Sequence, residues 1–258
     1  MTAVENYLVN VADGLNKLHQ PSTREALERA IEQCATTIAA GDLVYTFGTG
    51  HGSFAALEMF PRTGTCSGFR PIIENPLSNF HNIFGTQGVN QYRFLHTTEG
   101  YAQSIMSSYR FRSGETIVLF SQSGINAVVI DFAIEARKMG MIVIAVTSLP
   151  HSSNVPPKHS SGKRLFECAD IIVDTGVPLS DAAVMIEGYP HPVGPTSTII
   201  ATAITHAIVS GTVEALVRRG VEPLVMVNPN TAGADAANAQ NERVLEDSWN
   251  RFYNRQSV

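Results

Sequence analysis

The chain has 258 residues, 44% of them hydrophobic, which suits one large α/β domain or two small ones with a real core. Charged residues make up only 16%, the formal net charge is −5, and Lys and Arg are scattered, so the composition excludes the basic stripe of a nucleic-acid binder. The low charge density favours a chain that hides part of its surface in an oligomer.

Two helices are predicted before the first strand. Apolar residues recur at helical spacing over residues 4–18. A second helix is predicted over residues 22–40, with Ser22 as its N-cap and Glu25 three residues later. Gly41 is expected to end it, so the chain opens with a helical hairpin.

The rest of the chain alternates between short apolar runs and helical patterns. Strands are predicted over residues 43–47, 70–74, 116–120, 142–146, 171–174 and 224–227. Helices are predicted over residues 54–60, 98–109, 128–139, 196–219 and about 234–253, with Thr97 or Thr98 capping the second and Thr196 the fourth. Three polar segments without a period are predicted to be irregular loops: residues 75–96, 151–162 and 176–195.

This alternation predicts an α/β fold, a three-layer sandwich with a mostly parallel sheet and helices on both faces. Residues 1–40 would form the helical hairpin, 41–228 the sheet domain, and 229–258 a C-terminal helix packed on that domain. Ligands of such sheets bind outside the carboxyl ends of the strands, so the turns there are the expected place for functional residues.

Two turns at such strand ends carry glycines and hydroxyls, Gly48-Thr49-Gly50-His51-Gly52-Ser53 and Ser121-Gln122-Ser123-Gly124-Ile125-Asn126. Backbone N–H groups, the helix dipole and side-chain donors converge at such turns and bind anions. A tight turn or helix capping would explain the same residues without a ligand. Two such turns in one domain favour a small anionic ligand, and the predicted binding residues are Gly50, Ser53, Ser121, Gln122, Ser123 and Asn126.

Neither turn is a nucleotide fingerprint. The first lacks the third glycine of a dinucleotide site and the Gly-Lys-Ser/Thr of a phosphate-binding loop. The eight histidines also show no zinc spacing. We therefore expect neither a cofactor nor a metal.

Several motifs occur in the order that is typical of sugar isomerase (SIS) domains, which the chain resembles over roughly residues 40–227. They are the two turns above, the stretches over residues 136–148 and 169–178, and Gly-Pro-Thr-Ser-Thr over residues 194–198. Residues 159–165 and 230–235 resemble a bacterial branch of single-SIS proteins described as phosphosugar-binding. That branch usually has Gly-His-Ser at the first turn and Pro-Gly-Asp-Ala after the fifth strand, and this chain departs from both patterns.

The resemblance implies a flavodoxin-like fold and a homodimer or homotetramer. It implies a ligand phosphate held by the serine-rich turn together with the helix start Thr196, Ser197 and Thr198. It also implies an isomerase that needs no metal or nucleotide. In that family a glutamate removes the C2 proton and a histidine often opens the sugar ring, sometimes from the neighbouring subunit.

Aldose–ketose isomerisation needs a carboxylate or an imidazole with a pKa near neutral, and an acid that serves the ring and carbonyl oxygens. We predict Glu99, His51 and Asp181 as these catalytic groups. The alternatives among the same residue types are Glu58, Glu187 and His191.

The sequence therefore predicts an aldose–ketose isomerase, an intramolecular oxidoreductase of carbohydrate metabolism, that converts a phosphorylated or sulfonated sugar through an enediol. The alternative is a non-catalytic sugar-phosphate sensor, although the chain shows no basic recognition helix. Three cysteines without metal spacing, read as small buried residues, fit a reducing cytoplasm. We see no signal peptide and no apolar run near the ~20 residues that span a bilayer, so we expect no membrane partner.

Overall fold

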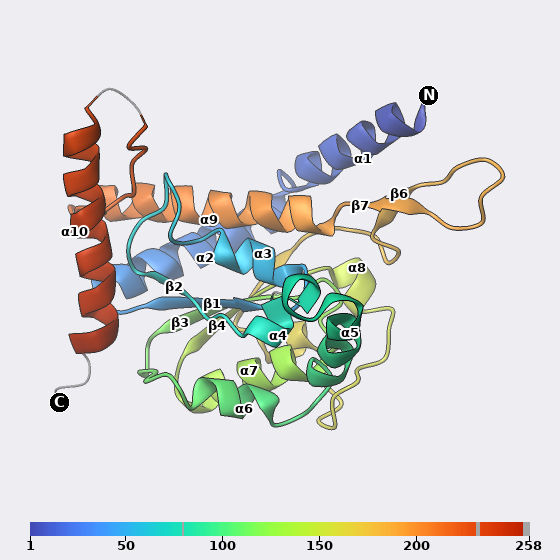
Figure 1. The fold of residues 1–258 in the computed structure, drawn as a ribbon, viewed down its shortest axis with the longest axis horizontal. Coiled ribbons are helices and arrows are strands. Elements are labelled where there is room, and N and C mark those ends of the chain that lie inside the picture. The colour runs from blue at the N-terminus through green and yellow to red at the C-terminus, as the bar shows by residue number, and fades with distance from the viewer. Residues whose placement is uncertain (79, 231–232, 255–258) are drawn as a thin grey trace.

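The computed structural model describes residues 1–78, 80–230 and 233–254. It confirms the predicted three-layer α/β fold, with helices on both faces of one parallel sheet (Figure 1). The sheet has the order β2-β1-β3-β4-β5. Its strands are β1 (Val44–Gly48), β2 (Phe69–Pro71), β3 (Thr116–Phe120), β4 (Ile142–Thr147) and β5 (Ile171–Asp174).

The central strands have mainly apolar sequences because both faces of each strand are buried. Every residue of β1 and β3 is buried, as expected for a parallel sheet that is covered on both sides. The strand order reverses between β1 and β3, and such a switch point is where doubly wound sheets bind their ligands. The two hydroxyl-bearing turns follow these two strands.

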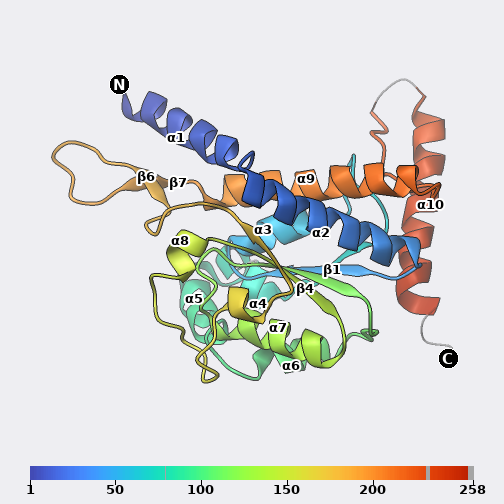
Figure 2. The same ribbon diagram turned by 180° about the vertical axis from the view of Figure 1, so that it is seen from behind.

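One face of the sheet is covered by three helices, seen together in Figure 2. They are α2 (Pro21–Ala39), α3 (Gly52–Leu57) and α9 (Ser197–Arg218). Helix α10 (Ala234–Tyr253) lies where β1 begins, since Arg251 donates to the carbonyls of Ile38 and Asp42. The sheet end at which β1 begins is therefore closed by a helix.

The other face carries the second core cluster, and further short helices flank the carboxyl ends of the strands. The elements of this side are α4 (Asn75–Ser78), α5 (Phe80–Leu95), α6 (Tyr101–Met106), α7 (Ala127–Lys138), α8 (Leu149–Ser152) and the 3₁₀ helix η1 (Leu165–Cys168). Among the described residues of the helices on this side, α7 contributes the most buried apolar ones, seven in all.

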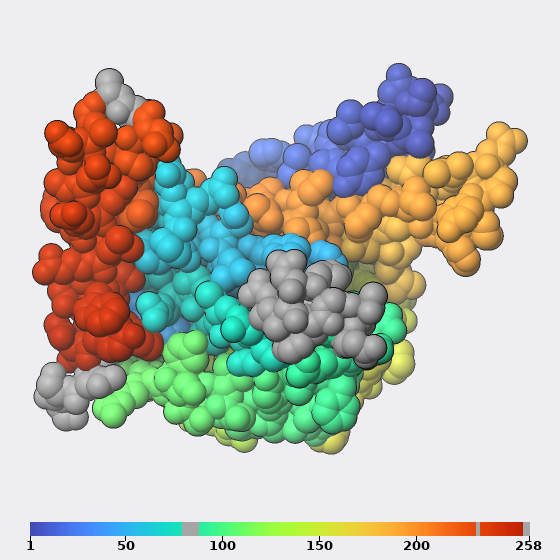
Figure 3. Space-filling view, viewed as in Figure 1, coloured from blue at the N-terminus to red at the C-terminus, as the bar shows by residue number. Residues whose placement is uncertain are grey.

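Two elements project from the body as separate arms, clearly visible in the space-filling view (Figure 3). One is α1 (Ala3–Lys17), which has no buried residue. The other is a hairpin of β6 (Ala182–Val184) and β7 (Val193–Pro195). They meet where the Tyr7 hydroxyl donates to the carbonyl of Pro195 at 2.8 Å.

Several sequence-based predictions are corrected by the structure. Residues 75–96 contain the helices α4 and α5 instead of an irregular loop, and residues 176–195 contain the hairpin. The apolar run 224–227 makes only an isolated bridge, between Val225 and Cys66. Helix α2 is not capped by Ser22, because Pro21 already occupies its first turn, where a missing N–H is tolerated.

Helix α9 is long and apolar enough to cross a bilayer by length and composition, contrary to our expectation that no run approaches that length. In the fold it packs against α2 and α3. Its residues Ile200, Ile204 and Ile208 are buried in the core, so packing accounts for its apolar character. The three cysteines are free and buried, as predicted.

Candidate active site

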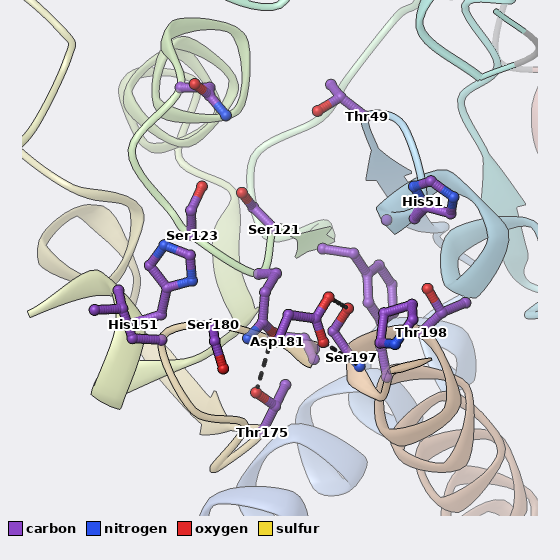
Figure 4. A pocket seen from close by; sticks show the side chains of 18 of the residues that line it. Thr49, His51, Ser121, Ser123, His151, Thr175, Ser180, Asp181, Ser197 and Thr198 are labelled. Carbon is purple, nitrogen blue, oxygen red and sulfur yellow. Dashed lines mark hydrogen bonds between the residues drawn. The ribbon is translucent and has the colours of Figure 1, made fainter. Parts of the chain in front are cut away.

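A cavity of about 370 Å³ opens at the carboxyl ends of the strands (Figure 4). This volume falls in the range of small-molecule sites. Its walls come from the turns that follow β1, β3, β4 and β5 and from the first turn of α9. The fold therefore brings four separate turns to one place, as the switch point of the sheet predicts.

The turn between β3 and α7 lines the cavity with Ser121, Gln122, Ser123 and Asn126. Asn126 is the N-cap residue of α7, yet that helix has no side-chain cap. Helix capping, the alternative explanation for this turn, is therefore not what these side chains do. The Gln122 Nε2 and Asn126 Oδ1 atoms are buried and have no hydrogen-bond partner among the described residues.

In the turn between β1 and α3, the two residues predicted to bind the ligand support the turn instead. The N–H of Gly50 donates to the Leu77 carbonyl at 2.7 Å, and the Ser53 hydroxyl donates to the Gly50 carbonyl at 2.6 Å. Gly50 has φ +58°, and a Cβ there would lie 2.5 Å from the Tyr92 hydroxyl. The residues of this turn that line the cavity are Thr49, His51 and Gly52.

Asp181 reaches the cavity, but its carboxylate is bound to the start of α9. Oδ1 accepts from the N–H groups of Thr196 and Ser197 at 3.0 and 2.7 Å, and Oδ2 accepts from the Ser197 hydroxyl at 2.7 Å. Thr196 is the N-cap residue but makes no side-chain cap and does not line the cavity. The predicted anion site at this helix start is thus filled by the protein's own carboxylate.

His151 lines the cavity on the wall opposite His51 (Figure 4). It lies in α8, directly after β4, and its Nδ1 atom is buried without a hydrogen-bond partner among the described residues. Burial lowers the pKa of this imidazole below its ordinary value, while the charge of Asp181 acts in the opposite direction. Burial thus favours the neutral imidazole, which is the form that can accept a proton.

The sequence signature of the SIS domain matches residues 6–148 of this chain. A UPF0309 protein of Oceanobacillus iheyensis is 32% identical over 240 residues, which cover 93% of this chain and 95% of that protein. The chain is a SIS-domain protein of the UPF0309 family. The resemblance seen in the sequence is therefore confirmed.

Solved structures of the same fold include two proteins of different kinds. A phosphoheptose isomerase from Francisella tularensis superposes with a TM-score of 0.51 at 14% identity, over 82% of this chain and 98% of that one. The Vibrio vulnificus NanR protein complexed with ManNAc-6P superposes with a TM-score of 0.50 at 16% identity, over 95% of this chain and 69% of that one. At such low identities these similarities establish the SIS fold alone.

Glu99 does not reach the cavity of this SIS domain. It is exposed, and its carboxylate accepts from the N–H and the hydroxyl of Ser160 at 2.7 and 2.5 Å. These bonds lower its pKa, which is opposite to the shift that a general base for neutral pH needs. The prediction of Glu99 as a catalytic group of this cavity therefore has no support in the geometry.

The alternative candidates for the catalytic groups also lie outside the cavity lining. Glu58 forms an ion pair with Arg62 at 2.6 Å, and its carboxylate lies 3.3 Å from His206 Nε2. Glu187 and His191 are exposed residues of the segment that joins β6 to β7. None of them touches the space that a ligand of this cavity would occupy.

Sequence reasoning missed several lining residues of this SIS domain, namely Thr49, Tyr92, His151, Thr175 and Ser180. The sequence did offer an indication that His151 could line the site. It lies shortly after the strand predicted over residues 142–146, and Ser121 follows the strand predicted over residues 116–120. Tyr92 had none, because it comes from a segment predicted to be irregular.

Proposed function

We propose that this SIS-domain protein is a metal-free aldose–ketose isomerase that acts on a phosphorylated or sulfonated sugar. The observation that carries the proposal is one cavity that joins a serine-rich turn to two histidines on opposite walls. Anion binding and proton transfer are the two tasks of such an enzyme, and each has its own residues here.

The anionic group of the sugar would bind at the turn between β3 and α7. Ser121 and Ser123 bring hydroxyls to this wall, and Gln122 brings a buried amide donor without a described partner. The start of α7 adds the positive end of a helix dipole. All these donors are neutral, so they suit the reversible binding of a metabolite.

The proton would be carried between C2 and C1 by His151, acting as the base. Burial lowers the pKa of its imidazole and so favours the neutral form, and a general base has to be unprotonated at the start of the reaction. His51, on the opposite wall, would serve the ring oxygen. This assignment replaces Glu99, and it leaves Asp181 as an anchored carboxylate instead of a proton carrier.

A non-catalytic sugar-phosphate sensor is the second candidate function. The observation in its favour is that no carboxylate free of protein partners lines the cavity within the described residues, because Asp181 is tied to α9. The fold is also shared with NanR, whose structure contains ManNAc-6P.

Solvent exchange separates the two functions. A panel of aldose and ketose phosphates is first screened for binding by calorimetry, and each ligand that binds is then incubated with the protein in D₂O. We expect ¹H NMR to show loss of the C2 proton signal of at least one aldose phosphate, with the corresponding ketose phosphate as product. Binding without exchange for every ligand would reject the isomerase and leave the sensor.

We also infer that the protein works as an oligomer of identical chains. Both arms expose apolar side chains that no described part of the same chain covers: Val4, Leu8, Val9, Met185, Ile186 and Tyr189. An isolated two-stranded hairpin is marginal in water, and a helix without a buried face gains little from packing. A second copy of the chain would cover both arms.

A further inference from the structure

The first turn of α9 is an anion site that already contains an anion. Two backbone N–H groups and one hydroxyl, all from Thr196 and Ser197, converge on the Asp181 carboxylate within 3.0 Å. Donors with this arrangement at the start of a helix of 22 residues suit a phosphate oxygen as well as a carboxylate oxygen. Asp181 and Ser197 also line the cavity, so this position lies within reach of a bound ligand.

The backbone holds Asp181 in this place. Asp181 has φ +59°, and it is the only residue other than glycine with a positive φ among the described residues. Asp tolerates this left-handed conformation better than most residues. Its own carbonyl also accepts from the Thr196 N–H and hydroxyl, so the loop before β6 is fastened to α9 at two points.

The described lining of the cavity has no Lys or Arg, so the Asp181 carboxylate meets no permanent positive charge there and is held by the donors at the start of α9. A second ligand anion at this end of the cavity would meet a like charge in a partly dehydrated space, where repulsion is strong. A hydroxyl or an ammonium group would instead donate to the remaining lone pairs of the carboxylate.

We propose that Asp181 is a specificity-determining residue, whose carboxylate fills a second anion position and restricts the cavity to ligands with a single anionic group. The proposal rests on the proposed function for the place of the first anion, at the turn between β3 and α7. It assigns the sugar hydroxyls to the Asp181 end and excludes sugar bisphosphates as ligands. Phosphate binding tests it without any reference to catalysis.

The test compares the wild type with Asp181→Gly and Asp181→Asn. Glycine adopts φ +59° freely and vacates the anion position, whereas asparagine tolerates this φ and keeps the position filled by a neutral amide. Calorimetric titration with inorganic phosphate should show one more equivalent bound to Asp181→Gly than to the wild type. Asp181→Asn should bind the same number of equivalents as the wild type.

A second titration compares fructose 1,6-bisphosphate with fructose 6-phosphate. The affinity ratio of the two ligands should shift towards the bisphosphate by roughly 10-fold or more in Asp181→Gly, the factor that one hydrogen bond to a charged group is worth. A smaller shift is expected in Asp181→Asn, which removes only the repulsion. Because asparagine preserves the cap on α9, this variant keeps the proposal open to refutation if the glycine variant does not fold.

Unchanged phosphate stoichiometry in Asp181→Gly, together with unchanged ligand ratios in both variants, would overturn the proposal. Failure of the proposed function would give a different result. If the first anion does not bind at the turn between β3 and α7, Ser123→Ala should bind phosphate as tightly as the wild type does. The additional equivalent in Asp181→Gly would still appear in that case.

Discussion

Three side chains in the cavity keep buried polar atoms without a partner among the described residues. They are Gln122 Nε2, Asn126 Oδ1 and His151 Nδ1. Buried polar atoms are rarely left unpaired, because each costs about 1–3 kcal/mol when it loses water without gaining a partner. One is a donor, one an acceptor and one an imidazole nitrogen, which together match a ligand that carries several hydroxyls.

His151 is expected to control the acidic limb of the pH–rate profile. Burial lowers the pKa of this imidazole from its ordinary value, so kcat/KM should fall only when the pH drops below that lowered pKa. The Asp181 charge raises this pKa, so Asp181→Asn should move the limb to still lower pH. His151→Gln should abolish C2 proton exchange while ligand binding persists.

The measurement is the pH dependence of C2 proton exchange by NMR for the three proteins. His51→Gln is the matched control, since it removes an imidazole from the opposite wall and should leave the limb of the remaining activity in place. An acidic limb that stays at the same pH in Asp181→Asn would contradict the assignment of His151.

At the residue scale, the sequence predicted which turn lines the cavity better than it predicted the surroundings of the acidic candidates. The turn from Ser121 to Asn126 lines the cavity because its place is set by the end of a strand, which is a local property. Glu99 is held by Ser160, a residue 61 positions away. Such a long-range bond leaves no trace in local spacing, and neither does the contact of Asp181 with α9.

At the scale of elements, the segment over residues 153–164 is pinned by a polar cluster. His159 Nε2 lies 2.9 Å from Asp131 Oδ1 on α7, and His159 Nδ1 lies 2.7 Å from the Ser161 hydroxyl. Asp131 is buried and also accepts from the N–H of Gly100 at 2.8 Å. This cluster connects α7 to the start of α6, at Gly100, and to the segment that follows α8, at His159. It therefore restrains the wall of the cavity that contains His151.

His159→Phe is expected to loosen this segment, because it removes both ring bonds and leaves Asp131 with one described donor. The free energy of unfolding should fall by about 1.5–3 kcal/mol, the range for a hydrogen bond to a charged group. Urea unfolding measures this loss, and hydrogen exchange should quicken over residues 153–164. Ser161→Ala, which changes only an exposed partner, should stay within about 0.5 kcal/mol of the wild type; equal effects of the two variants would contradict this role.

Elements were predictable where a local pattern and burial agree. The strand predicted over residues 116–120 matches β3 because a run buried on both faces has to be apolar throughout. The run over residues 224–227 was equally apolar, but among the described residues it pairs only with the short segment over residues 64–67, through one isolated bridge between Val225 and Cys66, and so forms no strand. Helix α5 was missed because its sequence is polar and aromatic and shows no clear helical period, although Tyr92 and Leu95 near its end pack on the core cluster.

On the scale of the whole molecule, the two arms are the main unexplained surface of a single chain. Leu8 of α1 is 61% exposed and Met185 of the hairpin 62% exposed. Neither arm was predicted as such, because a sequence pattern shows that a helix is amphipathic but not which surface covers its apolar face.

Leu8→Glu should weaken self-association. A two-fold interface contains each substitution twice, so the loss of about 1.5–3 kcal/mol per buried leucine raises the dissociation constant roughly 100-fold or more. Light scattering after gel filtration should show an oligomer for the wild type and a monomer for this variant. Val217→Glu is the control, since Val217 is 60% exposed but lies on α9, away from both arms; an identical mass for all three proteins would refute the role of α1.

The hairpin leaves the body next to Asp181 and returns at Thr196, the two residues that the start of α9 ties together. A partner that binds the tip of this hairpin would therefore act on the bonds between Asp181 and the start of α9, which place the Asp181 carboxylate in the cavity. Assembly and sugar binding would then be thermodynamically coupled. The factor by which a bound sugar raises the association constant of the oligomer would equal the factor by which assembly raises the affinity for the sugar.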